Sequence, residues 1–283
     1  MLKLDYSLET TREKAQWIRC LSIEAVHAAK SGHPGGPLGL ADIFAHLFFG
    51  VLRHRPHEPA WADRDRLLIS NGHVCAVRYA AMALAGYFPR ADLKSFRRLG
   101  SVLQGHPSTK FLPSVENSSG SLGQGLSQAV GLSLGLRMAK SESRVFCVMS
   151  DGECGEGMTW EAVQAAVHYR APVIALLDFN GIQIDGYVKD VLDLGDLAAK
   201  FRAMGMRTIE ADGHDHSAIA SAFRETLPYR EGPQMILFRT ILGKGVSFME
   251  NQPAWHGKPP SDSEAEQALL ELGYANLPAL SVA

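Results

Sequence analysis

The chain alternates between short, continuous apolar runs and longer segments in which apolar residues recur at helical spacing. One apolar run spans 145–149, a helix-period segment follows, and a second apolar run spans 173–177. Continuous runs of this length are typical of strands buried on both faces of a parallel sheet, and parallel neighbours need a crossover that is usually a helix. The pattern therefore predicts two neighbouring parallel strands joined by a helix.

The same alternation continues along the rest of the chain and predicts a doubly wound, mainly parallel α/β sheet flanked by helices. We expect helices over 10–30, 42–52, 74–84, 92–99, from 122 onward, 196–204, 217–227 and 262–272, and further strands over 67–69, 206–210 and 234–239. No internal repeat or linker interrupts the pattern, so we expect residues 1–283 to form a single domain.

Polar residues follow the two central apolar runs at the point where each run stops. Asp151 follows the first run and Asn180 the second. Because the carboxyl ends of parallel strands meet at one edge of a sheet, these side chains could share one hard cation. Each residue also precedes a glycine, so each alone could be only a turn. The two together are the more specific signal.

Local signals predict several boundaries. Thr10 and Glu13 have the spacing of a capping box at the start of the first helix, and Gly32 suits a left-handed cap at its end. The glycine- and proline-rich segment Ser31 to Leu40 should form a tight loop, and 100–120 should form a long loop of the kind that is often functional.

Small residues recur every four positions in the helix that starts near Leu122, namely Gly123, Ser127, Gly131 and Gly135. Each interior glycine costs a helix about 1 kcal/mol, so something should lie close against this face. The pattern leaves open whether that is the core of the same chain or another subunit.

Composition describes an ordinary globular protein, with 46% hydrophobic residues, 20% charged residues and a net charge of −2. This charge offers no basic surface for nucleic acid. We find neither a signal sequence nor a run of 18 apolar residues, so we expect no membrane insertion. The four cysteines form no C-x-x-C pair, and Cys147 falls within an apolar run, which favours a reduced, cytoplasmic protein.

Four of the eleven histidines share one setting, since each borders a glycine. They are His33, His73, His106 and His256. A single loop histidine is usually only solvated, but four in glycine-rich loops of one sheet indicate proton-transfer chemistry.

These motifs resemble the amino-terminal, cofactor-binding part of transketolases. SGHPGGPLGLAD, RDRLLISNGH, QGHP, GSLGQGLSQAVG, SDGECGEG, DFNGIQIDG, ADGHD and WHGKPP occur in the family's order over about residues 11–260. The segment 150–180 is also similar to the thiamine diphosphate signature, an acidic Gly-Asp-Gly turn followed about thirty residues later by an Asn pair. It departs from that signature at Ser150 and Phe179.

The resemblance implies roles for individual residues. Asp151 and Asn180 would ligate a divalent cation, Mg²⁺ or else Ca²⁺ or Mn²⁺, through their side chains, and Ile182 through its carbonyl. The four histidines would assist proton transfers and hold the sugar, and Glu156 and Glu161 would lie near a subunit interface. Glu156 could equally be a solvated charge at a helix start. The implied thiamine diphosphate contacts are His73, Leu122, Gly123, Asp151, Gly152, Glu153, Asn180, Ile182 and His256.

In the family, a second domain binds the aminopyrimidine and supplies an activating glutamate, and a third domain follows. This chain carries the motifs of the first domain only. We therefore expect the N-terminal subunit of a split transketolase that works with a C-terminal partner subunit, with two of each chain, and transfers a two-carbon ketol unit between sugar phosphates or related substrates.

Several alternatives stay open. One is a transketolase-like half with an unusual acceptor in specialised metabolism, and another is a non-catalytic regulatory subunit that keeps the fold. The α chain of a 2-oxo acid dehydrogenase component shares the cofactor motif but not the histidine set. A deoxyxylulose-phosphate-synthase-like half is disfavoured by WHGKPP. A nicotinamide dehydrogenase lacks its G-x-G-x-x-G signature.

Overall fold

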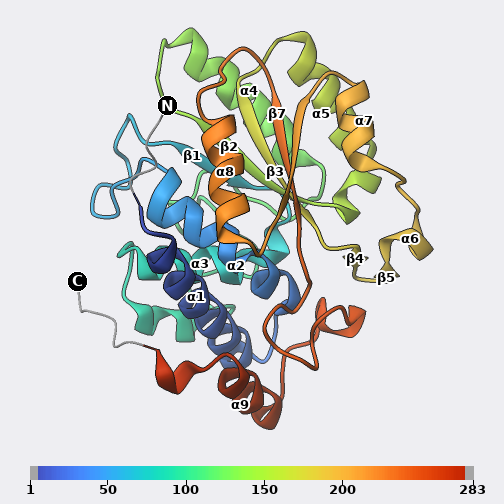
Figure 1. Cartoon of the computed structure of the whole chain (residues 1–283). Coiled ribbons are helices and arrows are strands. Elements are labelled where there is room, and N and C mark those ends of the chain that lie inside the picture. The colour runs from blue at the N-terminus through green and yellow to red at the C-terminus, as the bar shows by residue number, and fades with distance from the viewer. Residues whose placement is uncertain (1–5, 278–283) are drawn as a thin grey trace.

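The computed structural model describes residues 6–277, whose strands form a parallel sheet in the order β1-β2-β3-β7-β6 and a separate antiparallel pair, β4 and β5 (Figure 1). The strands are Arg66–Ile69 (β1), Val145–Ser150 (β2), Val173–Phe179 (β3), Ile182–Gln183 (β4), Gly186–Tyr187 (β5), Arg207–Asp212 (β6) and Gln234–Arg239 (β7). This arrangement confirms the predicted parallel α/β sheet.

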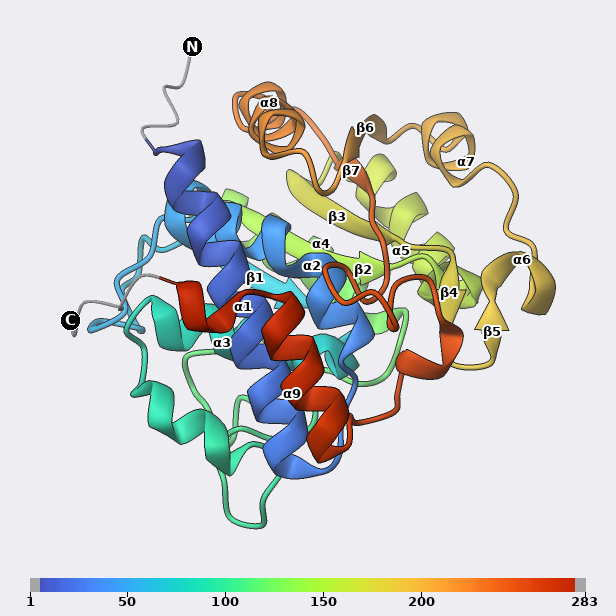
Figure 2. The same ribbon diagram turned by 60° about the horizontal axis from the view of Figure 1, so that its bottom comes forward.

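Helices cover both faces of the sheet (Figures 1 and 2). The α-helices are Leu8–Ala29 (α1), Gly35–His46 (α2), Cys75–Leu84 (α3), Gln124–Met138 (α4), Gly157–His168 (α5), Val188–Val191 (α6), Leu197–Ala203 (α7), His216–Thr226 (α8) and Asp262–Glu271 (α9). Helices α1, α2, α3 and α8 pack on one face, whereas α4, α5 and α7 pack on the other. Helix α9 lies against α1.

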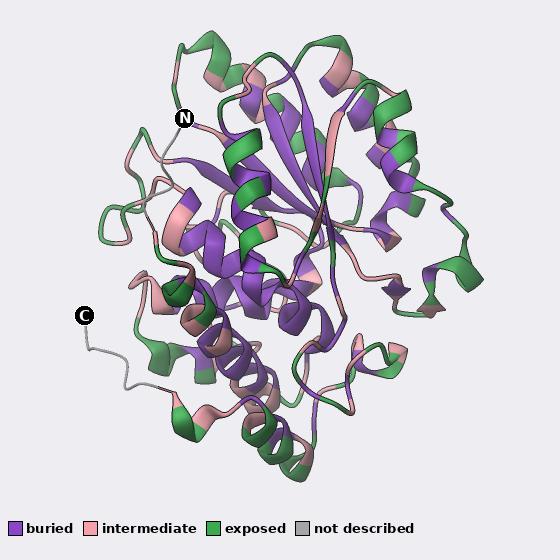
Figure 3. Ribbon diagram, in the orientation of Figure 1, coloured by how far each residue is buried: buried purple, intermediate pink, exposed green. Residues whose placement is uncertain are grey.

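Alternate residues of the central strands enter opposite cores. In β2, Phe146 and Val148 pack into the core under α1, α2, α3 and α8, while Cys147 and Met149 pack into the core under α4, α5 and α7. All four of these side chains are 0% exposed. Figure 3 shows the same burial along the central strands. Burial on both faces explains why these strands are continuously apolar in the sequence.

Most predicted elements are confirmed to within a few residues, and β7 matches its predicted bounds. The hairpin of β4 and β5 and the short helix α6 were not predicted. Segment 90–95 is a 3₁₀ helix rather than an α-helix. The long loop over 100–120 is confirmed to lack helix and strand.

The capping prediction at the first helix was wrong. Helix α1 starts earlier, and Ser7 caps it by accepting from the backbone N–H groups of Glu9 at 3.1 Å and Thr10 at 3.4 Å. At the other end, Lys30 and not Gly32 is the C-cap, in the left-handed conformation with φ of 50°, and Gly32 follows with a positive φ of 133°. The α1 cap shows that a serine one turn upstream can replace a matching capping box.

The segment predicted as a tight loop over 31–40 is mostly helix, because α2 starts at Gly35. A Cβ at Gly35 would lie 2.7 Å from the Leu242 side chain, and one at Gly36 would lie 2.7 Å from the Val74 side chain. The two glycines therefore allow α2 to pack closely against neighbouring chain segments, a tertiary gain that outweighs their poor helix propensity.

Three of the four small residues predicted to form one face of α4 are not packed against the core of this chain. Gly131 and Gly135 are exposed, and a Cβ at either would meet no atom of the described residues within 4 Å. Ser127 is exposed as well. Tight internal packing, one of the two predicted explanations, is therefore wrong for these positions.

Among residues 6–277, no helix combines the length and the apolar character needed to cross a membrane. All four cysteines are buried and none forms a disulfide. Cys147, in β2, is 0% exposed, which confirms its predicted role as a small core residue.

Candidate active site

Loops that follow four parallel strands meet at the carboxyl edge of the sheet and enclose a cavity of about 380 Å³. Ligands of open α/β sheets bind at this edge, because the loops there diverge around a crevice. The lining residues are His33, Gly36, His73, Val74, Gly120, Leu122, Ser150, Gly152, Glu153, Glu156, Asp178, Asn180, Ile182, Gln183, Ile184, Asp185, Leu242 and His256.

Three of the four predicted histidines stand together in this cavity. The ring centroids of His33 and His73 are 5.1 Å apart, those of His73 and His256 are 5.0 Å apart, and those of His33 and His256 are 5.7 Å apart. Their segments lie far apart in the sequence, so only the fold assembles them. The fourth, His106, is exposed, lies outside the lining and packs against Gly120.

Burial favours the neutral form of the clustered imidazoles. It lowers the pKa of His33 to about 4, with further lowering by nearby His256, Arg97 and His106. It also lowers the pKa of His73 well below the ordinary value and lowers that of His256. At neutral pH these rings are therefore uncharged and able to accept protons. Two ring nitrogens, Nδ1 of His33 and Nδ1 of His256, are buried without a hydrogen-bond partner within residues 6–277.

Asp151 is 0% exposed and is not part of the lining, although its chain neighbours Ser150 and Gly152 are. Its carboxylate accepts from the backbone N–H of Gly152 at 2.7 Å and from that of Gly181 at 2.5 Å. Burial raises the pKa of Asp151 to about 6, although these hydrogen bonds oppose the rise. The backbone thus fixes one buried carboxylate next to the lining residue Gly152.

Asn180 follows β3, and its side chain is fixed on both sides. Its Oδ1 accepts from the N–H of Ile182 at 2.9 Å, and its Nδ2 donates to Asp178 Oδ2 at 3.0 Å. Asp178 is 2% exposed, also accepts from the Thr240 hydroxyl, and has its pKa raised by burial to about 7. This carboxyl was missed, although Asp178 and Asn180 are two positions apart and so share one face of an extended segment.

Glu153 lines the same cavity and is 0% exposed. Its carboxylate accepts from the Ser70 hydroxyl, from the N–H of Gly123 at 2.8 Å and from the N–H of Ser150 at 3.3 Å. Burial raises its pKa to about 7. The N–H of Gly123, expected to approach the diphosphate, is thus donated to Glu153, and Gly123 itself lies outside the lining.

The remaining predicted residues lie at or beyond the rim. Glu156 is exposed and lines the cavity, and a Cβ at Gly123 would lie 2.9 Å from its Cβ. Glu161 is exposed on α5 and is not part of the lining. Leu122, Gly152 and Ile182 all line the cavity as predicted.

The two departures from the cofactor signature sit in different environments. Ser150 lines the cavity and donates its N–H to Glu153, so its backbone takes part in the site. The side chain of Phe179 is outside the lining and instead packs with the core on the α4 face, with the Arg239 guanidinium 5.3 Å from its ring centroid. A phenylalanine at this position therefore leaves the cavity unchanged.

The chemistry of the cavity fits an anionic cofactor held through a divalent cation. Asp151, Glu153 and Asp178 are buried carboxyl groups with raised pKa values, and no residue of the described lining is a lysine or arginine. A bound cation would supply the positive charge that both the carboxyls and a diphosphate require. No cluster of three or more His, Cys, Asp or Glu residues suited to a metal occurs within residues 6–277, so the amide of Asn180 and the carbonyl of Ile182 would have to complete the ligand set.

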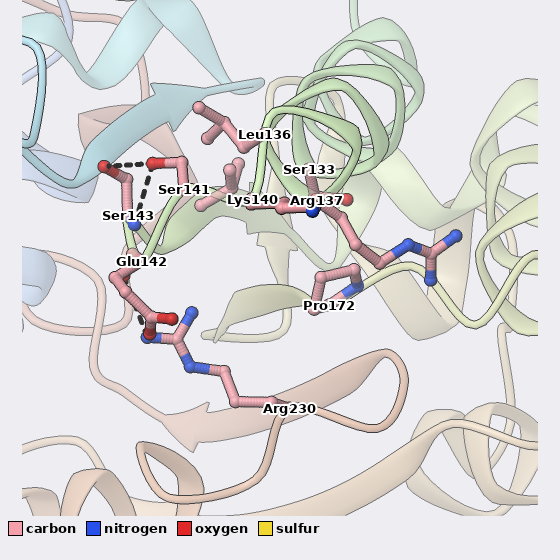
Figure 4. Close-up of a pocket in the computed structure, with 10 residues that line it drawn as sticks. Ser133, Leu136, Arg137, Lys140, Ser141, Glu142, Ser143, Pro172 and Arg230 are labelled. Carbon is pink, nitrogen blue, oxygen red and sulfur yellow. Dashed lines mark hydrogen bonds and ion pairs between the residues drawn. The ribbon is translucent and has the colours of Figure 1, made fainter.

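A second hollow, of about 260 Å³, lies at the opposite edge of the sheet, where β2 and β3 begin (Figure 4). Two of its three basic side chains are used within the chain. Arg137 donates to the carbonyls of Tyr169 and Arg170 at 3.1 and 2.8 Å, and Arg230 donates to the carbonyl of Glu142 at 2.9 Å. These bonds satisfy carbonyls at the end of α5 and in a loop, which is a structural role.

Comparison with known proteins agrees with this geometry. Residues 10–282 match the family model of the transketolase, thiamine diphosphate binding domain. The 6-deoxy-6-sulfo-D-fructose transketolase subunit SqwG of Clostridium sp. (strain MSTE9) is 37% identical, over 92% of this chain and 95% of that protein. Transketolase 1 of Escherichia coli (strain K12) is 36% identical, over 96% of this chain but 43% of that protein.

Solved structures give the same result. The transketolase of Leishmania mexicana superposes with a TM-score of 0.89 and 33% sequence identity, over 95% of this chain and 41% of that one. The chain thus spans less than half the length of these full transketolases but nearly all of the SqwG subunit. The chain belongs to the family of the transketolase thiamine diphosphate-binding domain.

Proposed function

We propose that this chain is the N-terminal subunit of a two-component, thiamine diphosphate-dependent transketolase, which transfers a two-carbon ketol unit from a ketose donor to an aldose or aldehyde acceptor. The observation that carries the proposal is the single cavity in which His33, His73 and His256 face Asn180 and the backbone at Gly152. Proton-transfer groups and cation ligands thus share one site. We treat residues 1–283 as one cofactor-binding domain.

In this proposal, Asp151 and Asn180 hold a divalent cation through side-chain oxygens, and Ile182 holds it through its carbonyl. Mg²⁺ suits such oxygen ligands, and Ca²⁺ or Mn²⁺ could replace it. A cation held by these residues would supply positive charge for the diphosphate, which no lining lysine or arginine of the described chain could neutralise. When bound, the cofactor supplies the carbon nucleophile for breaking and forming the carbon–carbon bond.

The histidines act on the substrate hydroxyls. The lowered pKa of His33 and His73 keeps both rings neutral, so that each can accept a proton from a hydroxyl and return it in a later step. His256 forms the third side of the cluster, and His106, which is exposed and packs against the lining residue Gly120, would meet the part of the sugar that extends from the cavity.

A separate C-terminal chain would complete the site. The full transketolases are more than twice as long as the part this chain matches, and the SqwG subunit is of similar length to this chain. Apolar side chains are exposed near the cavity, with Ile184 61% and Met158 42% exposed, as expected of a surface that another chain covers. We propose a heterotetramer with two of each chain, located in the cytoplasm, with Glu156 and Glu161 at the subunit contact.

Related proteins are named for, or described with, different sugars. SqwG is named for 6-deoxy-6-sulfo-D-fructose, and structures of the Pichia stipitis transketolase are described with xylulose 5-phosphate and fructose 6-phosphate. Comparing these three donors on the assembled enzyme would separate a sulfosugar role from the pentose phosphate pathway.

The decisive experiment reconstitutes the chain with its C-terminal partner and measures thiamine diphosphate binding by calorimetry in the presence of Mg²⁺. We expect binding and ketol transfer by the pair, loss of binding in Asp151→Ala, and unchanged binding in the exposed control Glu225→Ala. Full activity of the isolated chain would refute the two-component proposal. An assembled pair that binds no cofactor would instead indicate a non-catalytic regulatory subunit.

A further inference from the structure

A small cavity beside the start of β1 contains a buried arginine without a partner. Arg78, on α3, is 2% exposed, and its Nε and Nη1 have no hydrogen-bond partner within residues 6–277. The cavity offers about 30 Å³. Its lining residues are Phe48, Leu52, His54, Pro59, Arg64, Asp65, Leu67, Arg78, Met82, Tyr87, Ser114 and Glu116. None of them lines the cofactor cavity.

The carboxylates of this cavity are already paired with other arginines. Asp65 accepts from Arg53 Nη2 at 3.2 Å and from its backbone N–H at 2.9 Å. Glu116 accepts from Arg64 Nε at 2.8 Å and Nη2 at 3.1 Å, and Arg66 Nε lies 3.7 Å from the same carboxylate. With Arg78, four guanidinium groups therefore share two carboxylates.

The other polar side chains of the cavity do not compensate this charge. His54 Nε2 lies 2.8 Å from the carbonyl of Phe48 and donates to it, so that its Nδ1 accepts from the Tyr87 hydroxyl at 3.1 Å. The His54 N–H is thus donated to the backbone, and the Tyr87 hydroxyl hydrogen is donated to His54. Asp63, which also acts on Arg66, is exposed and screened by water.

A guanidinium stays protonated even when burial lowers its pKa, as it does for Arg78. Glu116 is the opposite charge that acts most on Arg78, but it is shared with Arg64 and Arg66, so it compensates the charge of Arg78 only in part. A buried charge without full compensation destabilises a fold. Water could satisfy the N–H groups but not the charge. A space of this size admits one small ion or a water or two.

We propose that this cavity is a binding site for a small monovalent anion of the size of chloride, held by the Nε and Nη1 groups of Arg78. The anion neutralises the arginine and so stabilises α3. Helix α3 follows directly on the 3₁₀ turn Gly72–Val74, which carries His73. The site therefore supports a helix that positions part of the histidine cluster.

A crystal of the full chain grown or soaked in sodium bromide tests the site directly, because bromide has the charge of chloride and scatters anomalously. We expect an anomalous peak within hydrogen-bond distance of Arg78 Nε and Nη1. Density there without anomalous signal would be water and would overturn the proposal. This measurement needs no variant and so remains decisive if substitutions prevent folding.

Thermal unfolding tests the energetic role. In sodium chloride, compared with sodium gluconate at equal ionic strength, the unfolding equilibrium constant of the wild type should fall about tenfold for each tenfold rise in chloride above its dissociation constant. Arg78→Met should lose this difference, while Arg98→Met, which removes an exposed arginine, should keep it. A chloride effect that survives in Arg78→Met, or none in the wild type, would refute the site.

Discussion

At the scale of single residues, the floor of the cofactor cavity is built from carboxyl groups whose hydrogen bonds come mainly from the backbone. Asp151 is fixed by N–H groups of the two strand-end turns, and Glu153 joins the ends of β1 and β2 to the start of α4. Glu153 accepts at the N-terminus of α4, a place where helices often bind an anion. The protein thus fills that position itself, so in the proposed site the diphosphate would depend on the cation for its positive charge.

Truncating Glu153 should destabilise the chain. Glu153→Ala leaves the N–H groups of Gly123 and Ser150 and the Ser70 hydroxyl buried without their acceptor, at about 1–3 kcal/mol per group before relaxation, so we expect a loss of roughly 2–4 kcal/mol. Urea unfolding would measure it. Exposed Glu161→Ala should change stability by less than about 0.5 kcal/mol. Equal stability of the two variants would contradict this role for Glu153.

The histidine cluster makes stability depend on pH. His33 has a folded pKa of about 4, below the value of about 6.5 for an unfolded chain. Between these values the unfolded chain binds a proton at His33 that the native chain does not, so stability rises with pH across this window and is lost as pH falls. Relative to His33→Asn, the wild type should therefore lose stability from pH 6.5 to pH 4.

The measurement is the free energy of unfolding of both proteins at several pH values, with exposed His57→Asn as the control. The difference between wild type and His33→Asn isolates this histidine from the buried carboxyls, whose pKa values are raised into the same range. A difference that stays constant with pH would show that His33 titrates alike in both states.

At the scale of elements, strands were the easiest part to predict and helix starts the hardest. Strand β7 matches its predicted residues because its central residues, 235–238, form a continuous apolar run that is buried on both faces of the sheet. The start of α2 at Gly35 was missed because its glycines gain from contacts with Leu242 and Val74, which no local pattern contains. Only the fold shows which chain segments pack so closely against a helix that no residue larger than glycine fits between them.

The candidate site was likewise predictable from the sequence only in part. The positions of Asp151 and Asn180 at one sheet edge followed from strand ends, and Asp151 accepts from the N–H of Gly181, the residue after the lining residue Asn180. The partners of Glu153 were not predictable, because Ser70 and Gly123 come from separate elements. A glutamate in a glycine-rich turn gives no sign of burial until those elements meet.

Two glycines of α4 should respond oppositely to the same substitution. A Cβ at Gly125 would lie 2.6 Å from the Cα of Ser70, whereas one at Gly131 would meet nothing within 4 Å of the described chain. Gly125→Ala should therefore destabilise the chain by about 1–3 kcal/mol through overpacking. Gly131→Ala should stabilise it by about 0.5–1 kcal/mol, because alanine loses less backbone entropy in a helix.

Urea unfolding of the isolated chain checks both values, and each variant is the control for the other. The same pair tests the open face of α4 in the assembled enzyme. If another subunit packs against that face, Gly131→Ala should stabilise the isolated chain yet weaken assembly. Unchanged assembly would exclude close packing at that glycine.

At the scale of the whole molecule, some of the exposed apolar side chains lie together at the cavity rim, whereas others lie elsewhere on the surface. Leu122, Met158, Ile184 and Tyr187 are 36%, 42%, 61% and 40% exposed and lie on or near segments that form the cavity rim. Leu270, on α9, is 76% exposed on a different helix. Isolated apolar residues are normal on any surface, but a group beside a functional cavity indicates contact with another chain.

Introducing a charge at the rim should therefore impair assembly without affecting folding. Met158→Glu places a carboxylate in the proposed contact, where it would be buried without a partner, so we expect the dissociation constant for the C-terminal partner to rise at least about tenfold. The unfolding midpoint of the isolated chain should stay unchanged, because Met158 is exposed there. Leu270→Glu makes the same chemical change far from the rim and should bind the partner as the wild type does. Sedimentation of the mixed chains would measure both, and equal weakening by the two variants would place the contact elsewhere on the molecule.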